Sequence, residues 1–253
     1  MENSQLCINI YRAAAPKFTA MIKFLLSFLS LCVFSASAQV PTIEPDVLYP
    51  MPDIDYVELE RLLDLHDNGG WDSMSRDEQE LLLLTEDDPV LSHFYSYACS
   101  WYCGGEIRSV TASSSLSERY KASNAHDFSI NTAWVEGVAG YGVGESLLYT
   151  FPGTCSCITR VLVLNGYTKN ESVWRNNARV KRLLMYYNDQ PYAILNLKDR
   201  RDCQQFEIGL LGYEDKETAP AWSIKFEILE VYPGDKYEDT VISEIYFDGI
   251  HVH

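Results

Sequence analysis

Two carboxylates stand at the ends of a glycine-rich stretch in the middle of the chain. Glu136 and Glu145 enclose residues 137–144, which include four glycines. A pair of carboxylates across a cleft is what glycoside hydrolysis requires. A carboxylate can also accept hydrogen bonds from sugar hydroxyls without catalysis, and 36 acidic residues supply many such pairs by chance. The pair therefore favours sugar binding over hydrolysis, which stays open as an alternative.

Other catalytic patterns are absent from the sequence. It contains no nucleophile elbow, no phosphate-binding loop followed by Lys-Ser or Lys-Thr, and no His-Glu-x-x-His motif. His126 next to Asp127 has no recognisable third member of a triad. His251 and His253 are typical of a solvated tail. We expect no enzymatic activity.

Aromatic and amide side chains supply what a sugar site needs, namely ring faces and fixed polar groups. Tyr141 lies in the glycine-rich stretch, and a second group lies between predicted strands that end at Leu164 and begin at Val180. Trp174 is the aromatic residue expected to be most exposed, and Trp134 is expected in the core. The predicted ligand-binding residues are Glu136, Tyr141, Glu145, Tyr167, Trp174, Asn176, Asn177 and Arg179.

Two of these residues have purely structural alternatives. Tyr167 is also compatible with a packing role in which its hydroxyl binds one backbone group. Arg179 is equally compatible with an ion pair to Glu136 or Glu145.

The amino-terminal residues predict export. Met21 and Lys23 precede an apolar run from Phe24 to Phe34, which is too short to span a bilayer, and Ala36-Ser37-Ala38 fits a signal peptidase site before Gln39. We expect residues 1–38 to be removed and the protein to be periplasmic, at the cell surface or secreted. A lipoprotein signal ending at Cys32 is a weaker alternative because Leu31 is large.

The net charge of −16 disfavours nucleic acid and anionic membranes as partners. Neutral or cationic sugars are more compatible with this surface, and no later segment predicts membrane insertion.

The remaining chain divides into three parts. Residues 39–52 are proline-rich and predict an extended linker. Residues 53–96 predict two short helices, one over about 54–66 with Val57, Leu62, Leu63 and Leu65 on its apolar side, and one beginning at the capping box Ser75/Glu78 and ending at Asp88-Pro89. This acidic segment is a possible docking element for a protein partner.

Residues 97–253 predict an all-β domain, an antiparallel β-sandwich or jelly roll, because short apolar runs alternate with turn residues and no helices separate them. Residues 223–231 alternate polar and apolar side chains, which is typical of a half-buried strand. The eight predicted strands are 107–112, 147–151, 158–164, 180–187, 192–197, 205–208, 222–231 and 241–247.

Five cysteines follow the predicted cleavage site: Cys99, Cys103, Cys155, Cys157 and Cys203. An exported protein favours disulfides over a four-thiolate zinc site, for which Cys-x-Cys spacing is short. A bridge between the 99–103 and 155–157 segments would join the helical segment to the β domain.

Several motifs carry a resemblance. The pattern Asp127-x4-Thr132-x-Trp134 resembles the discoidin, or coagulation factor type C, fold. Together with Gly142-Val143-Gly144-Glu145, Asn165-Gly166-Tyr167 and Val231-Tyr232-Pro233-Gly234, it resembles the glycan-binding (translocation) domain of streptococcal NAD-glycohydrolase toxins and of exported Bacteroidetes proteins. The resemblance covers roughly residues 96–250 and implies a non-catalytic carbohydrate-binding module, with a protein-interaction module as the alternative.

The resemblance also implies a structural cation. Discoidin-like domains often hold one where the Asp-x4-Thr loop meets a glutamate near the last strand, and the matching residues are Asp127, Ser129, Thr132 and Glu244. Ca²⁺ prefers such oxygen donors. A loop closed by Asp127 alone, as an Asx turn, is the open alternative.

Overall fold

The computed structural model describes residues 39–87, 101–215 and 218–250. Its described elements from β1 onward belong to one compact unit, Val40–His253. The predicted signal peptide lies outside the described residues. Within the described part of the chain, no helix has the length and apolar character needed to cross a membrane.

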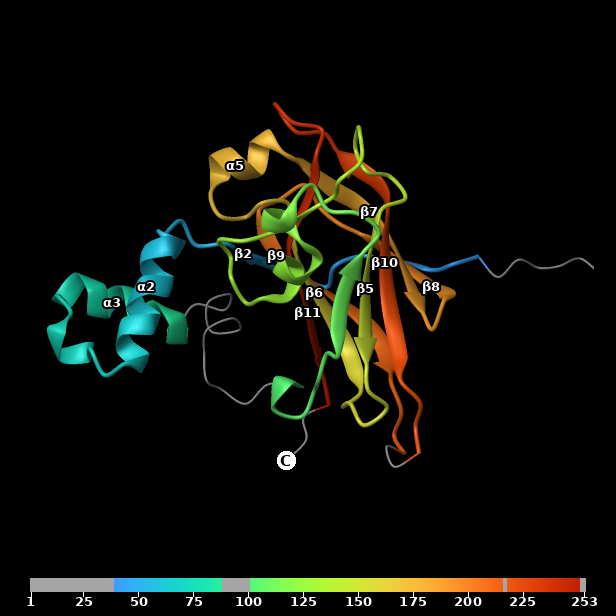
Figure 1. Ribbon diagram of the computed structural model, residues 1–253, viewed down its shortest axis with the longest axis horizontal. Coiled ribbons are helices and arrows are strands. Elements are labelled where there is room, and N and C mark those ends of the chain that lie inside the picture. Colours follow the sequence, from blue (N-terminus) through green and yellow to red (C-terminus); the bar gives the residue numbers. More distant parts are fainter. Residues whose placement is uncertain (1–38, 88–100, 216–217, 251–253) are drawn as a thin grey trace, which may run out of the picture. The chain divides into compact units, whose positions relative to one another are not determined.

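The β domain is a sandwich whose two layers share the last strand, β11 (Figure 1). One layer runs β2-β9-β6-β11, and the other runs β7-β10-β5-β3 with β8 beside β7. The strands are β1 (Thr42–Ile43), β2 (Val47–Pro50), β3 (Ser109–Ala112), β4 (Trp134–Val135), β5 (Ser146–Phe151), β6 (Ile158–Asn165), β7 (Ala178–Tyr187), β8 (Gln190–Asn196), β9 (Asp202–Leu211), β10 (Trp222–Tyr232) and β11 (Thr240–Gly249). The fold class is confirmed.

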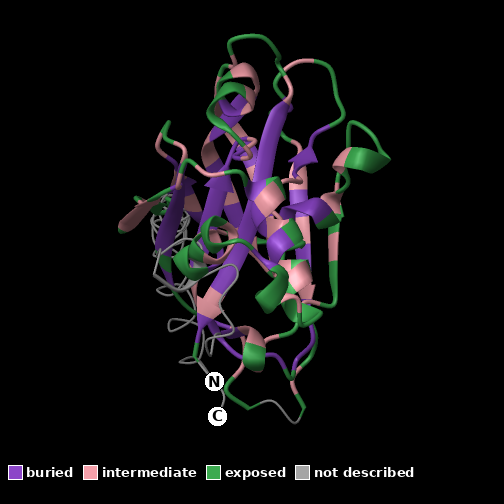
Figure 2. Ribbon diagram, turned by 90° about the vertical axis from the view of Figure 1, so that its left-hand side faces the viewer, coloured by how far each residue is buried: buried purple, intermediate pink, exposed green. Residues whose placement is uncertain are grey.

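The eight predicted strands all form, with ends shifted by a few residues. In β10, the residues Trp222, Ile224, Phe226 and Ile228 are buried and their neighbours are partly exposed, as the alternation predicts. These side chains join Trp134, Val161 and Phe247 in the main core between the layers. Figure 2 shows buried residues along the strands and exposed residues in the connecting loops.

Residues 39–52 do not form a linker, contrary to the prediction. β1 pairs in parallel with β8, and β2 pairs antiparallel with β9. Ile43 packs on the main core, and Glu44 forms an ion pair with Lys198. The prolines suggested an unpaired chain, but β1 contains no proline and β2 has its proline, Pro50, only at its end, and both strands satisfy backbone groups of β8 and β9 that would otherwise be unpaired.

Two helices, α2 (Tyr56–Asp67) and α3 (Arg76–Asp87), form as predicted, and the turn Trp71–Ser73 lies between them. The capping box is present, since Ser75 N donates to Glu78 Oε2 (2.7 Å) and Glu78 N donates to Ser75 Oγ (3.3 Å). The buried face of α2 consists of Tyr56, Leu59 and Leu62, whereas Val57 is 52% exposed, contrary to the prediction. This face packs with Leu162, Leu164 and Tyr246 of the sandwich in a second core cluster.

One α-helix of the described β domain was not predicted. α5 (Glu171–Asn176) occupies the connection between β6 and β7. Asn170 caps it by accepting a hydrogen bond from Val173 N (2.9 Å).

Candidate functional site

A hollow of about 420 Å³, here called the tyrosine pocket, opens between the loops at one end of the sandwich. α5 and its C-cap provide one wall, and the loop that precedes β11 provides another. The pocket combines three tyrosine rings with two amides and one carboxylate. Its lining residues are Leu116, Tyr120, Val135, Tyr167, Val173, Asn176, Asn177, Tyr237 and Asp239.

Backbone contacts fix the two walls against each other. The carbonyl of Asn176 accepts hydrogen bonds from Lys236 N (3.1 Å) and Tyr237 N (2.8 Å). Gly234 makes this approach possible, because a Cβ at that position would lie 2.6 Å from the Asn176 carbonyl oxygen. The position of the Tyr237 ring is therefore tied to that of α5.

Tyr167 makes the backbone contact that was its structural alternative, and it also lines the tyrosine pocket. It is one of the residues that line the tyrosine pocket, and its hydroxyl donates to the Asn131 carbonyl (2.9 Å). Partial burial raises the pKa of Tyr167, so the hydroxyl stays protonated and can keep this bond. The bond holds the phenol ring at the pocket.

Trp174 is buried, contrary to the prediction that it is the most exposed aromatic residue. It is 6% exposed, and its Nε1 donates to the Asn165 carbonyl (2.9 Å). The sequence placed it in a polar loop, but the loop is helical at this point and turns the indole inward. Trp134 is fully buried, as predicted.

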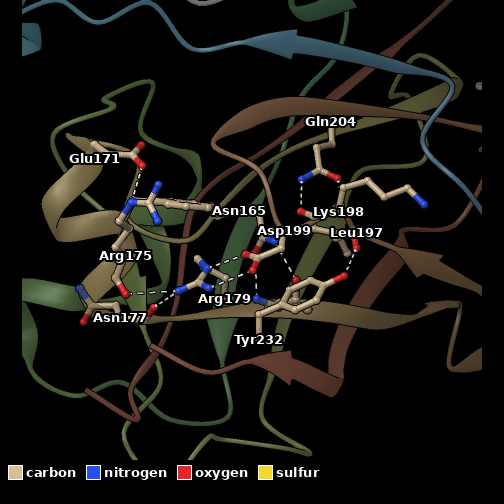
Figure 3. A network of polar contacts seen from close by, with 12 residues as sticks. Asn165, Glu171, Arg175, Asn177, Arg179, Leu197, Lys198, Asp199, Gln204 and Tyr232 are labelled. Carbon is tan, nitrogen blue, oxygen red and sulfur yellow. Dashed lines mark hydrogen bonds and ion pairs between the residues drawn. The ribbon is translucent and has the colours of Figure 1, made fainter. Parts of the chain in front are cut away.

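Arg179 belongs to a polar network outside the tyrosine pocket (Figure 3). It is buried and pairs with Asp199 (2.8 and 3.2 Å), and its Nη1 donates to the Asn177 carbonyl (2.8 Å). The predicted ion pair with Glu136 or Glu145 is therefore wrong. With Trp174, Arg179 lines a second, charged hollow of about 400 Å³, to which α5 also contributes Glu171 and Arg175.

Glu136 and Glu145 are both engaged with protein groups. Glu136 is fully buried and accepts hydrogen bonds from Val138 N (2.8 Å) and Thr240 N (3.3 Å). Burial raises the pKa of Glu136. Glu145 accepts a hydrogen bond from Ser113 Oγ (2.5 Å). Glu136 thus fastens the glycine-rich loop to β11 and is not available to a ligand.

Tyr141 is 37% exposed, but it is not among the residues that line the tyrosine pocket. Its carbonyl accepts a hydrogen bond from Thr240 Oγ1 (2.8 Å). Of the eight predicted ligand-binding residues, the structure therefore brings Tyr167, Asn176 and Asn177 together in this pocket.

Tyr120, Tyr237 and Asp239 are the other polar residues of the lining, and they were missed from the sequence, as were the apolar lining residues Leu116, Val135 and Val173. Tyr237 and Asp239 follow the Pro233-Gly234 turn, and a tyrosine in a polar turn segment was the signal that could have drawn attention to them. Their proximity to α5 depends on the parallel pairing of Thr240 and Val241 with Ala178 and Arg179, which no local pattern reveals.

The predicted cation loop brings its four residues together. Ser129 N lies 3.1 Å from Asp127 Oδ1 and 3.1 Å from Glu244 Oε1, and Thr132 Oγ1 donates to both Asp127 oxygens (2.8 Å). Glu244 is fully buried, and its Oε2 accepts no hydrogen bond from any described residue. Burial, and then the charge of Asp127, raise the pKa of Glu244.

This donor set fits a hard cation in part. A buried carboxylate oxygen without a hydrogen bond next to a second carboxylate is the arrangement that a cation stabilises. Within the described ranges, however, no three His, Cys, Asp or Glu side chains are placed to hold a metal ion. Besides Asp127 and Glu244, the cation would need further ligands, which Thr132 and backbone carbonyls would have to supply.

The two cysteine segments lie in contact, as the proposed bridge requires, although Cys99 lies outside the described residues. Trp101 Nε1 donates to the Ser156 carbonyl (3.1 Å), and Ser156 Oγ donates to the Gly104 carbonyl (2.9 Å). Cys203 is a buried thiol that forms no disulfide with a cysteine in the described ranges, and burial raises its pKa. The disulfide between the segments stays a prediction.

Comparison with known proteins decides the family. The model of the NAD glycohydrolase translocation F5/8 type C domain matches residues 101–248, more than half of the chain. The chain belongs to this family. No curated protein matches it.

Several solved structures are similar at low identity. The CBM32-1 and CBM32-2 domains of Clostridium perfringens ZmpB in complex with GalNAc are 11% identical (TM-score 0.41), with 56% of this chain and 33% of that chain covered. Chitosan-binding module 1 of a chitosanase/glucanase from Paenibacillus sp. IK-5 is 16% identical (TM-score 0.37; 60% and 100% covered). CBM32-3 of a family 31 glycoside hydrolase from C. perfringens is 17% identical (TM-score 0.39; 56% and 91% covered). The chain thus spans about a third of the ZmpB structure that it matches.

Proposed function

We propose that this translocation-type F5/8 domain is a non-catalytic carbohydrate-binding module and that the tyrosine pocket is its binding site. The observation that carries the proposal is the composition of this pocket: three tyrosines and two asparagines line one hollow of about 420 Å³. Sugar rings have apolar faces that pack on aromatic rings and hydroxyls that need fixed polar partners.

The polar groups of the pocket suit hydroxyl recognition. Asn177 Nδ2 is engaged with the Val173 carbonyl (2.8 Å), which orients the amide and leaves its oxygen as an acceptor. The side chain of Asn176 forms no hydrogen bond with any described residue and can both donate and accept. A binding role fits this set better than hydrolysis, because Asp239 is the one carboxylate among the lining residues and hydrolysis needs two.

The proposal includes export and a structural cation. Residues 21–38 would act as a signal peptide that places the domain in the periplasm, at the surface or outside the cell. A Ca²⁺ ion would be held by Asp127, Glu244 and Thr132, with the Ser129 loop around it, and would neutralise the two carboxylates. Its contribution would be to the stability of the loop that carries Trp134.

The test is binding of residues 39–253 to a broad glycan array, with Tyr237→Ala and Tyr120→Ala in parallel. Tyr141→Ala is the matched control, because Tyr141 is an exposed tyrosine that does not line the pocket. We expect a specific signal that both pocket variants lose and the control keeps. Binding that survives both pocket variants would contradict this site, and a silent array with folded protein would contradict the function.

A protein-interaction module is the second candidate. Val57, Trp71, Leu83 and Leu84 of the α2–α3 region are exposed apolar side chains. Together they could contact a protein partner. Glycan-array binding that depends on Tyr237 would argue against this role as the main one.

A further inference from the structure

The charge of the tyrosine pocket indicates which sugars it prefers. Asp239 is the one charged residue among the lining residues, and no lysine or arginine lines the pocket. The Asp239 carboxylate is partly buried, and it forms no ion pair or hydrogen bond with any residue in the described ranges. A carboxylate in this position lacks a counter-ion.

A second carboxylate, that of Glu136, lies near Asp239. Glu136 is buried next to Thr240, and Asp239 is near enough for its charge to raise the pKa of Glu136 further after burial has done so. The residues that line the pocket therefore carry a negative charge and no positive one, which disfavours an acidic ligand.

The tyrosines favour a cation as well. Lys236 Nζ lies 4.8 Å from the Tyr237 ring centroid, and the Arg119 guanidinium carbon lies 5.7 Å from that of Tyr120. Both rings thus already attract cationic groups of the chain through their π-faces. Neither basic residue lines the pocket, so a ligand ammonium would compete with Lys236 and Arg119 for these rings and would gain the Asp239 carboxylate as its counter-ion.

We propose that the tyrosine pocket selects sugars that carry a free, protonated amino group, with Asp239 as the counter-ion of the ammonium and Tyr120 and Tyr237 as its aromatic partners. This inference rests on the proposed carbohydrate-binding function and narrows its ligand class. N-acetylation would remove the positive charge and with it the contribution of Asp239.

The test is calorimetric titration of residues 39–253 with oligomers of glucosamine and of galactosamine, and with N-acetylated oligomers of the same sugars and lengths, below the pKa of the amine. We expect the free amines to bind at least about tenfold more tightly, since a charge-assisted contact of this kind contributes more than the energy of one tenfold step. Asp239→Asn should abolish the preference, and Asp239→Glu should retain part of it. Asp235→Asn is the matched control, because Asp235 lies in the same loop but lines the charged hollow.

The outcomes separate the two proposals. Equal binding of free and N-acetylated sugars, or a preference that survives in folded Asp239→Asn, overturns the amine selectivity and leaves carbohydrate binding intact. Absence of binding for every sugar, with Tyr237→Ala indistinguishable from wild type on the array, overturns both.

Discussion

The guanidinium carbon of Arg179 lies over the Trp174 ring, 4.7 Å from its centroid, while the same guanidinium pairs with Asp199. Trp174 is the residue of α5 that anchors this helix in the protein interior, and the tyrosine pocket depends on α5 and its C-cap for Val173, Asn176 and Asn177.

We expect Trp174→Ala to lower the free energy of unfolding by about 3–5 kcal/mol, because it removes a buried indole and leaves the Asn165 carbonyl without its donor. Urea unfolding measures this loss, with the exposed Tyr141→Ala as control. A variant as stable as wild type that no longer binds glycan would place the indole on the binding surface.

We expect the contribution of Glu136 to the free energy of unfolding to fall as the pH rises. Its pKa in the folded state is raised, so the folded protein holds the proton more tightly than the unfolded chain. Its contribution is complete below the unfolded pKa of about 4.3 and is lost as pH rises through the folded pKa. Glu136→Gln should remove this slope from the unfolding free energy measured against pH.

The glutamine variant should also be less stable throughout by about 1–2 kcal/mol, because Glu136 accepts from two backbone N–H groups and glutamine offers one acceptor oxygen. An unchanged pH slope would show that other carboxylates cause it.

Cation binding at the Asp127 loop predicts a calcium-dependent Tm. Ca²⁺ at about 100 times its Kd should add about 2.7 kcal/mol to stability, and a chelator should reverse the effect. Glu244→Gln should abolish the response in calorimetry, because it removes the buried carboxylate. If the Tm of the wild-type protein changes with neither calcium nor chelator, the proposed cation site is contradicted and the Asx-turn interpretation is favoured.

Deleting residues 40–50 should destabilise the sandwich by about 2 kcal/mol or more and promote association. The deletion removes β1 and β2 and exposes the backbone groups of β8 and β9. Size-exclusion chromatography and urea unfolding report the two effects. Glu44→Ala, which breaks the exposed ion pair with Lys198 and the hydrogen bond from Asn196 Nδ2 but keeps both strands, should change stability by no more than about 1 kcal/mol.

The sequence predicted the regular elements better than the site. Alternation along β10 and the Ser75/Glu78 box are local patterns, and both formed as predicted. Trp174 was misplaced because helical turns as short as α5 have too few residues for a periodic signal.

The residues that form the tyrosine pocket could not be grouped from the sequence. Asn176 and Tyr237 are distant in the sequence, and their proximity arises from backbone hydrogen bonds between a helix end and a turn. Polar residues that line a pocket carry no periodicity. Their types indicated a sugar site, but their grouping followed from the tertiary structure.

The central position of β11 has a consequence for how the protein folds. Thr240–Gly249 pairs with both β6 and β7, so the last strand in the sequence lies where the two layers join. β1 pairs with residues about 150 positions later in the chain. Contacts of such long range form slowly. Neither layer can be completed until β10 and β11 have been synthesised, so both layers close late during translation.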